Sequence, residues 1–111
     1  MLIYFRTKKL QKTCSQERIM VKELGAARAG KLKQRLAELK AAETLSDISY
    51  LPPPRCHELT GTRAGQFSVD LEHPYRLLFI PADDPVPYRD DGGTNLLLVT
   101  EIEIIAIVDT H

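Results

Sequence analysis

The amino-acid sequence predicts an α+β fold, in which a helical layer packs on one face of a mostly antiparallel, twisted sheet. A short apolar strand comes first, and residues 17–42 then carry leucines at helical spacing. From residue 67 onwards, apolar and polar residues alternate as they do in strands. Helices that precede a run of strands, rather than alternating with them, favour this layered arrangement. A length of 111 residues suits one domain, so we expect residues 1–111 to form one.

The N-terminal part predicts a strand followed by two helical starts. Met1–Arg6 has the composition of a short strand. Thr7 can cap a first helical turn over Lys8–Cys14. Ser15 is a candidate cap for a second helix, and Glu17 lies where a carboxylate favours the helix dipole.

The second helix is expected to continue to Ala42, with a break near its middle. Gly25 and Gly30 weaken its centre, so we expect a kink or an interruption between them. An apolar face is predicted by leucines at positions i, i+4 and i+7, which are Leu32, Leu36 and Leu39. Together with the first helical turn over Lys8–Cys14, this helix makes the predicted helical pair.

The middle of the chain is expected to turn and then to form strands. Leu45–Ile48 predicts a short helical turn, and the three prolines Pro52–Pro54 predict an extended linker. Phe67–Leu71 alternates between apolar and polar residues, as in a half-buried strand. A turn at His73-Pro74 then leads into a strand over Tyr75–Ile80.

The C-terminal part predicts a long connection and one more strand. Pro81–Asn95 is polar, rich in proline, glycine and aspartate, and long for a hairpin connection. Leu96–Val108 is expected to be the final strand, and its length predicts a bend or a bulge. The sheet face away from the helices is expected to be free to bind a partner.

The formal net charge of zero hides an asymmetry along the chain. Residues 1–40 contain eleven basic and three acidic side chains, a difference of +8, so the remaining residues carry −8. A basic segment joined to an acidic one suggests a face that binds a polyanion. The alternative is that the basic helices pair internally with the acidic half, and the residues leave both open.

Composition also argues against several classes of protein. No apolar run approaches the roughly 20 residues of a membrane span, and no secretory signal pattern is present at the N-terminus, so a cytoplasmic protein is expected. Cys14 and Cys56 do not form a CxxC motif and are expected to be reduced thiols. We therefore expect no metal site and no cofactor.

Arg76 is the first candidate functional residue, because it stands inside an apolar strand. A charged side chain is rarely buried there without a partner. One interpretation is a clamp for a phosphate, since a guanidinium can bind two phosphate oxygens at once. The other is a structural ion pair across the sheet, with Asp70, Glu101 or Glu103.

Histidines and one loop arginine are further candidates. Imidazole exchanges protons near neutral pH, which suits acid–base chemistry at His57 and His111, although a lone histidine is more often structural. Arg63 lies in a loop bracketed by Gly61 and Gly65. At the tip of a tight turn, it would be either solvated or in contact with a phosphate.

The stretch around these residues resembles the RelE/ParE superfamily of bacterial toxin–antitoxin toxins, in its HigB ("killer protein") branch. The segment Leu36–Ala42, followed by Leu45, is similar to the family's second helix and its exit. The strongest similarity lies in spaced residues that follow in the family's order: Arg55, His57, Leu59, Gly61, Arg63, Gly65, Phe67-Ser68-Val69, Tyr75-Arg76-Leu77 and Asp109-Thr110-His111.

The resemblance implies a ribosome-dependent endoribonuclease that cuts mRNA without a metal. In that reaction a 2′-hydroxyl attacks its own 3′-phosphate, which requires a base, a positive clamp and an acid. The match assigns the clamp to Arg76 and the acid–base roles to His57 and His111. It assigns contacts with RNA or the ribosome to Arg63, Lys31, Lys33, Arg35 and Arg55.

The resemblance also implies partners. These are the ribosome with its mRNA, a cognate antitoxin of the helix-turn-helix, HigA-like kind, and operator DNA reached only through that antitoxin. Two departures from the family pattern, Thr60 for a lysine and Thr110 for a tyrosine, keep other interpretations open. The chain could be a ParE-like inhibitor of DNA gyrase, an inactive RelE-fold scaffold that binds antitoxin or RNA, or an RNA-binding protein without cleavage.

Overall fold

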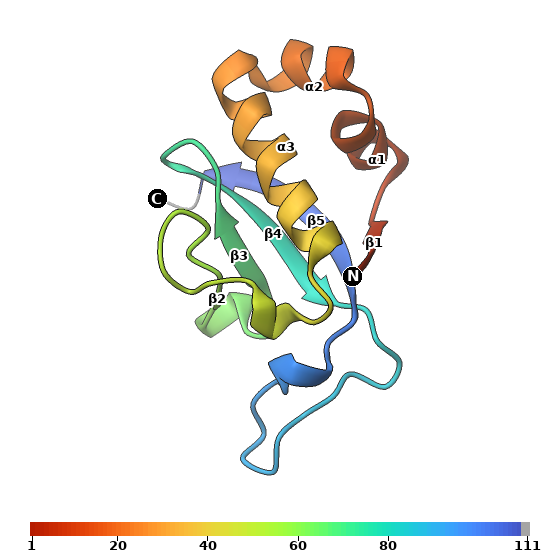
Figure 1. Cartoon of the computed structure of the whole chain (residues 1–111), viewed down its shortest axis with the longest axis vertical. Helices are drawn as coiled ribbons and strands as arrows, with labels where there is room; N and C mark the ends of the chain where they lie inside the picture. The colour runs from red at the N-terminus through yellow and green to blue at the C-terminus, as the bar shows by residue number, and fades with distance from the viewer. Residues whose placement is uncertain (110–111) are drawn as a thin grey trace.

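The computed structural model describes residues 1–109, which form a helical layer on one face of a five-stranded sheet. The sheet order is β1-β5-β4-β3-β2, with β1 parallel to β5 and every other pair antiparallel. Figure 1 shows α3 lying across the sheet, with the strands behind it. The predicted α+β class is confirmed. The elements are β1 (Leu2–Phe5), α1 (Lys8–Ser15), α2 (Glu17–Leu24), α3 (Ala26–Ala41), β2 (His57–Glu58), β3 (Phe67–Asp70), β4 (Tyr75–Pro81) and β5 (Glu101–Asp109).

The helical layer of the described residues contains three helices instead of the predicted pair. Thr7 caps α1 as predicted, because its Oγ1 accepts a hydrogen bond from the Leu10 N–H at 3.1 Å. The predicted cap at Ser15 is wrong, since Ser15 ends α1 and Gln16 precedes α2. The break lies at Gly25, whose φ of +80° is a conformation that glycine adopts at little cost. Gly30 lies within α3.

The core lies between α3 and the sheet. The apolar face of α3 contributes Leu32 and Leu39, which are fully buried. The sheet contributes Phe67 and Phe79, whose rings stack with their centroids 5.9 Å apart. Burying such large side chains supplies most of the stabilisation of a small fold. The core residues of β3 and β4 are Phe67, Val69, Leu77 and Phe79, so alternation turns the residues between them to the opposite face.

The expected final strand begins later than predicted. Leu96–Leu98 forms a short 3-10 turn, η3, in which the Asn95 side chain accepts a hydrogen bond from the Leu97 N–H. The strand β5 starts only at Glu101. The predicted bulge is confirmed, because Leu78 pairs with Ala106 while Phe79 pairs with Ile104, which leaves one extra residue in β5. Figure 1 shows the preceding connection extending away from the sheet.

The segment between α3 and β2 is folded rather than extended. The predicted short helical turn is present as η1 (Leu45–Asp47). The prolines that were expected to form an extended linker instead belong to a turn, in which the Arg55 N–H donates to the Leu51 carbonyl at 3.1 Å. The Asp70 N–H donates to the Pro54 carbonyl at 2.7 Å. This turn is therefore attached to the end of β3.

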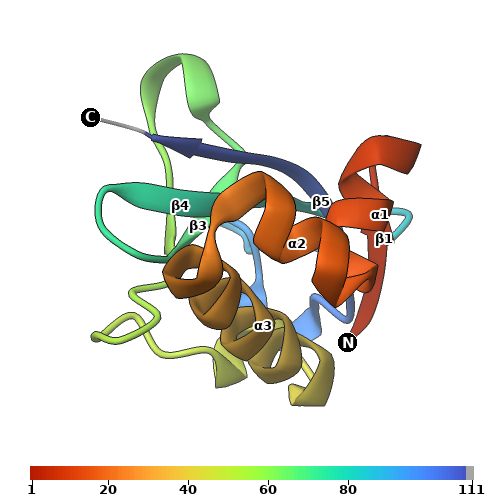
Figure 2. The same ribbon diagram turned by 90° about the horizontal axis from the view of Figure 1, so that it is seen from above.

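The face of the sheet away from the helices is partly covered, which corrects the expectation that it is free. Ser68 and Leu78 point to this face and are fully buried. Figure 2 shows the segment that carries η2 (Gly61–Arg63) on this side of the sheet, opposite the helices. An apolar residue such as Leu78 favours such a cover, because exposure of its side chain to water is unfavourable. Among residues 1–109, no helix is long and apolar enough to cross a membrane.

Candidate functional site

Two arginines from different parts of the chain approach one carboxylate, that of Asp70. Arg55 Nε lies 2.6 Å from Asp70 Oδ2, and Arg76 Nε lies 3.5 Å from Asp70 Oδ1. Arg76 and Asp70 are directly opposite each other in the β3–β4 pairing. Of the three acidic partners considered for Arg76, the structure selects Asp70. We call Arg55, Asp70 and Arg76 the arginine cluster.

The other two acidic candidates have different partners at the far side of the sheet. Glu101 accepts a hydrogen bond from the Tyr4 hydroxyl at 2.8 Å. Glu103 pairs with Arg6 at 3.1 Å. Both contacts join β5 to the N-terminal segment, so they stabilise the parallel edge of the sheet and leave Arg76 to Asp70.

Arg55 has an unusual backbone conformation. Its φ is +45°, and within residues 1–109 it is the one residue other than glycine with a positive φ. Side chains disfavour this region, and residues found there often belong to functional sites. The position follows the proline turn, where glycine would be the ordinary choice. The Arg55 side chain at this position contacts Asp70.

His57 lies next to the arginine cluster on the short strand β2. Its Nδ1 is 3.1 Å from the carbonyl oxygen of Arg55, and its side chain is exposed. It pairs directly with Ser68 of β3, two residues before Asp70. The Ser68 hydroxyl is buried and has no hydrogen-bond partner among the described residues. Through the pairings of β2, β3 and β4, His57 lies two strands from Arg76 and is offset from it by two residues, on the same face of the sheet.

The remaining predicted RNA contacts are spread over the molecule. Arg63 is exposed at the end of η2 and donates to Gln66 at 3.4 Å. Lys31 and Lys33 are exposed on α3, and Lys33 pairs with Glu17 at 3.0 Å. The helical layer and the arginine cluster therefore present basic groups in different regions of the surface.

Arg35 is not at the surface, which corrects its assignment as an RNA contact. Only 2% of Arg35 is exposed. Its Nε donates to the Asp70 carbonyl oxygen at 2.8 Å, and its Nη1 lies 3.1 Å from Glu38. The sequence carried a signal for this position, since Arg35 lies three residues after Leu32 and four before Leu39, on the apolar face of α3.

Asp70 is the residue that the sequence did not single out as central. Its carboxylate holds two arginines and its backbone carbonyl holds a third. It thereby connects the arginine cluster to the helical layer. A second missed contact involves Arg28 of α3, whose guanidinium lies 3.4 Å from the centroid of the Tyr75 ring, a cation–π contact beside Arg76.

Thr60, Thr110 and His111 are the remaining positions singled out in the sequence. Thr60, which stands where the resembled family has lysine, is exposed at the start of η2. His111 lies outside the described residues, as does Thr110. The last described residue, Asp109, pairs with Tyr75, the neighbour of Arg76.

The arginine cluster lines only a small cleft. The cleft that Arg55, Asp70 and Arg76 line has a volume of about 40 Å³, far below the roughly 300–1,000 Å³ of ordinary ligand pockets. Within residues 1–109, no group of three or more His, Cys, Asp or Glu residues could hold a metal ion. The arginine cluster is a partly buried group of charged side chains, with the side chains of Arg76 and Asp70 17% and 25% exposed.

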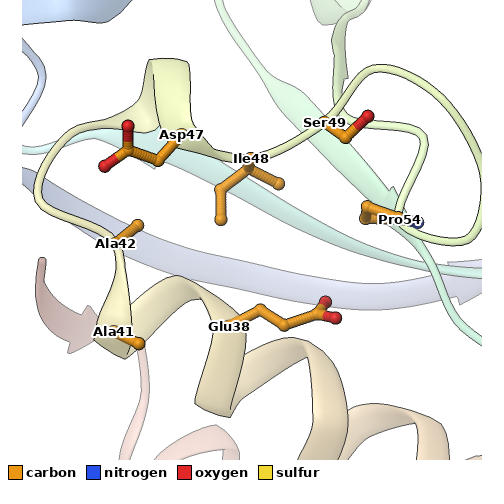
Figure 3. A pocket seen from close by; sticks show the side chains of 7 residues that line it. All are labelled: Glu38, Ala41, Ala42, Asp47, Ile48, Ser49 and Pro54. Atoms are coloured by element: carbon orange, nitrogen blue, oxygen red, sulfur yellow. The ribbon is translucent and has the colours of Figure 1, made fainter.

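A larger hollow elsewhere has the wrong charge for a nucleic acid. It has a volume of about 420 Å³ and lies between the end of α3 and η1 (Figure 3). Its charged lining groups, Glu38 and Asp47, are both acidic, and each is engaged. Glu38 pairs with Arg35, while Asp47 accepts a hydrogen bond from the Glu43 N–H at 3.0 Å.

Comparison with known proteins supports the fold. No family model matches the sequence, and no curated protein matches it either. Among solved structures, the chain is similar to the YoeB/ParE toxin from Agrobacterium tumefaciens. The TM-score is 0.60 at 11% sequence identity, and the match covers 100% of both chains. This chain therefore has the α+β fold of a YoeB/ParE-type toxin.

Proposed function

We propose that this chain is the toxin of a type II toxin–antitoxin system and that it cleaves mRNA on the ribosome. The observation that carries the proposal is the arginine cluster beside the exposed His57, on a toxin-type fold. Arg55 and Arg76 together carry two positive charges against the single negative charge of Asp70. The surplus charge favours a phosphate.

The proposed chemistry uses the side chains directly. The 2′-hydroxyl loses its proton to a base, and its oxygen attacks the adjacent phosphorus. The bond from phosphorus to the 5′-oxygen breaks, that oxygen takes a proton from an acid, and a 2′,3′-cyclic phosphate remains. Arg76 stabilises the charge that develops on the phosphate. His57 and His111 are the acid–base pair, and the assignment of His111 rests on the resemblance.

The exposed lysines of the helical layer supply a second region for RNA. Lys31 and Lys33 are exposed on α3, and basic side chains bind RNA through its phosphates whatever its sequence. Such contacts would hold the protein on ribosomal RNA while the arginine cluster meets the mRNA. Arg63, exposed at the end of η2, would hold the mRNA backbone.

A cognate antitoxin completes the proposal. The partner would be a helix-turn-helix protein of the HigA-like kind, which would neutralise the toxin and carry the complex to operator DNA. Co-expression with the neighbouring open reading frame, followed by copurification, tests this part of the proposal. Restored growth without a copurified complex would argue against direct neutralisation.

Primer extension tests the cleavage. Purified protein is mixed with programmed ribosomes or with naked mRNA, and the cut sites are mapped. We expect cuts only on ribosomes. His57→Ala and His111→Ala should each lower the rate by about 10²–10⁴-fold, the usual contribution of a general acid or base. Arg76→Ala should lower it by about 10²–10³-fold, as loss of an electrostatic clamp does.

Arg89→Ala is the matched control. Arg89 is exposed on the long connection and pairs with Asp91 at 3.3 Å, away from the arginine cluster. Its loss removes the same chemical group and should leave the cleavage rate unchanged. Equal losses in Arg89→Ala and Arg76→Ala would mean that charge in general, rather than a clamp, supports cleavage. Absence of cuts in both mixtures would contradict the proposal.

A ParE-like action on DNA gyrase is the second candidate. Two observations favour it: Arg76 is already paired with Asp70, and Thr60 stands in place of the resembled family's lysine. A supercoiling assay with purified gyrase separates the two functions. Inhibition that survives His57→Ala, without mRNA cleavage, would select the gyrase inhibitor.

A further inference from the structure

We infer that Arg55 is a positioning residue, which fixes the proton of His57 on Nδ1 through its backbone carbonyl and supports Arg76 through its side chain. The inference rests on the proposed function and assigns a role within that same site. Arg55 is the residue that contacts both halves of the site: His57 lies at its carbonyl oxygen, and Asp70, which holds Arg76, lies at its guanidinium.

The contact with His57 determines which ring nitrogen carries the proton. A carbonyl oxygen has no proton to donate, so the 3.1 Å contact is a hydrogen bond only when Nδ1 of His57 is protonated. The other nitrogen, Nε2, then has a free lone pair in the neutral ring. A hydrogen bond at one ring nitrogen commonly sets the state of the other in this way. Neutral His57 is therefore arranged to accept a proton at Nε2, which makes it the base.

The contact of Arg55 with Asp70 affects Arg76, the proposed phosphate clamp. Arg55 Nε lies 2.6 Å from Asp70 Oδ2, while the contact of Arg76 with the same carboxylate is longer, at 3.5 Å. Arg55 therefore takes the larger share of the negative charge. This leaves the guanidinium of Arg76 weakly held and able to turn towards a phosphate. Without Arg55, Asp70 would bind Arg76 more tightly and would repel the substrate.

The backbone of Arg55 allows both contacts at once. Its φ of +45° lies in the left-handed region, which glycine tolerates and β-branched residues strongly disfavour. The conformation is held by neighbouring hydrogen bonds, since the Arg55 N–H donates to Leu51 and the Cys56 N–H donates to Ser49. A substitution can therefore remove the guanidinium alone or disturb the backbone as well.

Nitrogen NMR of the imidazole rings tests the inference without any RNA. Spectra that correlate ring nitrogens with ring protons, recorded where the rings are neutral, distinguish a protonated Nδ1 from a protonated Nε2. The signals of His57 are identified by their loss in His57→Gln. We expect the proton on Nδ1, the opposite of the preference of a free histidine side chain in water. A His57 ring protonated on Nε2 would overturn the inference.

Three substitutions at Arg55 separate the two contacts. Arg55→Gly keeps the backbone conformation and should keep the Nδ1 proton, while cleavage falls by up to roughly 100-fold as the clamp loses its support. Arg55→Lys retains the positive charge beside Asp70 and should restore most of the cleavage. Arg55→Val should lose both the contact with Asp70 and the backbone conformation. The His57 ring should then return to the Nε2-protonated form. Arg89→Gly is the control and should leave the His57 spectrum unchanged.

The outcomes distinguish the inference from the proposed function. If Arg55→Val leaves the Nδ1 proton in place, Arg55 does not set the ring and the inference is wrong. If Arg55→Gly cleaves as fast as the unchanged protein, the Arg55 side chain does not support Arg76, and this part of the inference is wrong. Complete absence of cleavage by the unchanged protein overturns the proposed function instead, and the NMR result still decides whether Arg55 sets the ring.

Discussion

Asp83 and Thr100 join the two ends of the long connection between β4 and β5. The Thr100 hydroxyl donates to Asp83 Oδ2 at 2.7 Å, and the Thr100 N–H donates to the same oxygen at 3.0 Å. The Glu101 N–H adds a hydrogen bond to Oδ1 at 3.2 Å. One carboxylate therefore closes the connection at its base, just before β5 begins.

Replacing Asp83 should loosen this closure. We expect Asp83→Ala to lower the free energy of unfolding by about 1–2 kcal/mol, because charge-assisted hydrogen bonds to backbone N–H groups are lost. Urea unfolding followed by circular dichroism measures the change. Asp84→Ala is the control, since Asp84 is exposed, and it should change stability by less than about 0.5 kcal/mol. Equal effects of the two substitutions would contradict the role of Asp83.

The closure should also depend on pH. Burial by itself would raise the pKa of Asp83, but the hydrogen bonds from Thr100 and Glu101 outweigh it and lower the pKa below its ordinary value of 3.8. A lowered folded-state pKa means that the stabilisation is present above the ordinary value and is lost as pH falls through the folded value. Unfolding curves at a series of acidic pH values should show a loss that Asp83→Asn lacks.

Arg35 should matter for stability rather than for RNA binding. Its buried guanidinium contacts the Asp70 carbonyl and Glu38. Arg35→Ala removes both contacts. We expect a loss of about 2–4 kcal/mol, since removing one partner of a buried pair is costly. Lys31→Ala, on the exposed face of the same helix, should stay within about 0.5 kcal/mol. Denaturant unfolding measures both, and a small effect at Arg35 would contradict its structural role.

Replacing Ser68 should stabilise the fold, in contrast to the substitutions of Asp83 and Arg35. Its hydroxyl is fully buried without a hydrogen-bond partner among the described residues, and such a group costs free energy in the folded state. We expect Ser68→Ala to raise the free energy of unfolding by about 1 kcal/mol. Ser15→Ala, at an exposed position, serves as the comparison in thermal unfolding. A destabilised Ser68→Ala would show that the hydroxyl has a partner in solution.

Both thiols should be unreactive in the folded protein. Burial raises the pKa of Cys14 to about 11 and that of Cys56 to about 12, against an ordinary value of 9.0. Since the thiolate is the reactive form, a disulfide reagent at neutral pH should react slowly until denaturant is added. Rapid reaction of the native protein would contradict the burial of these side chains.

The same shifts have a consequence for stability at high pH. Because the folded-state pKa values are raised, the unfolded chain ionises first, so the contribution of the thiols is complete below pH 9.0 and is lost as pH rises through about 11–12. A double substitution of Cys14 and Cys56 by alanine should show a smaller loss over that range. Equal alkaline losses in the two proteins would assign the effect to other groups.

Local pattern in the sequence was enough to predict several elements. The cap at Thr7, a break between Gly25 and Gly30, a short helical turn within Leu45–Ile48 and the strand from Tyr75 all follow from residues close together in the chain. Helical and strand periods are local properties, so they can be recognised in the sequence without knowledge of the fold. The candidate residues His57 and Arg76 were also named from type and position.

The tertiary structure decided which of these residues meet. Asp70 is fifteen residues from Arg55 and thirty-five from Arg35, so their contacts depend on strand register and helix packing. The proline turn and the start of β5 were mispredicted because hydrogen bonds outweigh local composition there. The Asp70 N–H of β3 donates to the Pro54 carbonyl, and the Asn95 side chain accepts from the Leu97 N–H. The sequence determined the types of side chain available for a phosphate, and packing decided that Asp70 holds them together.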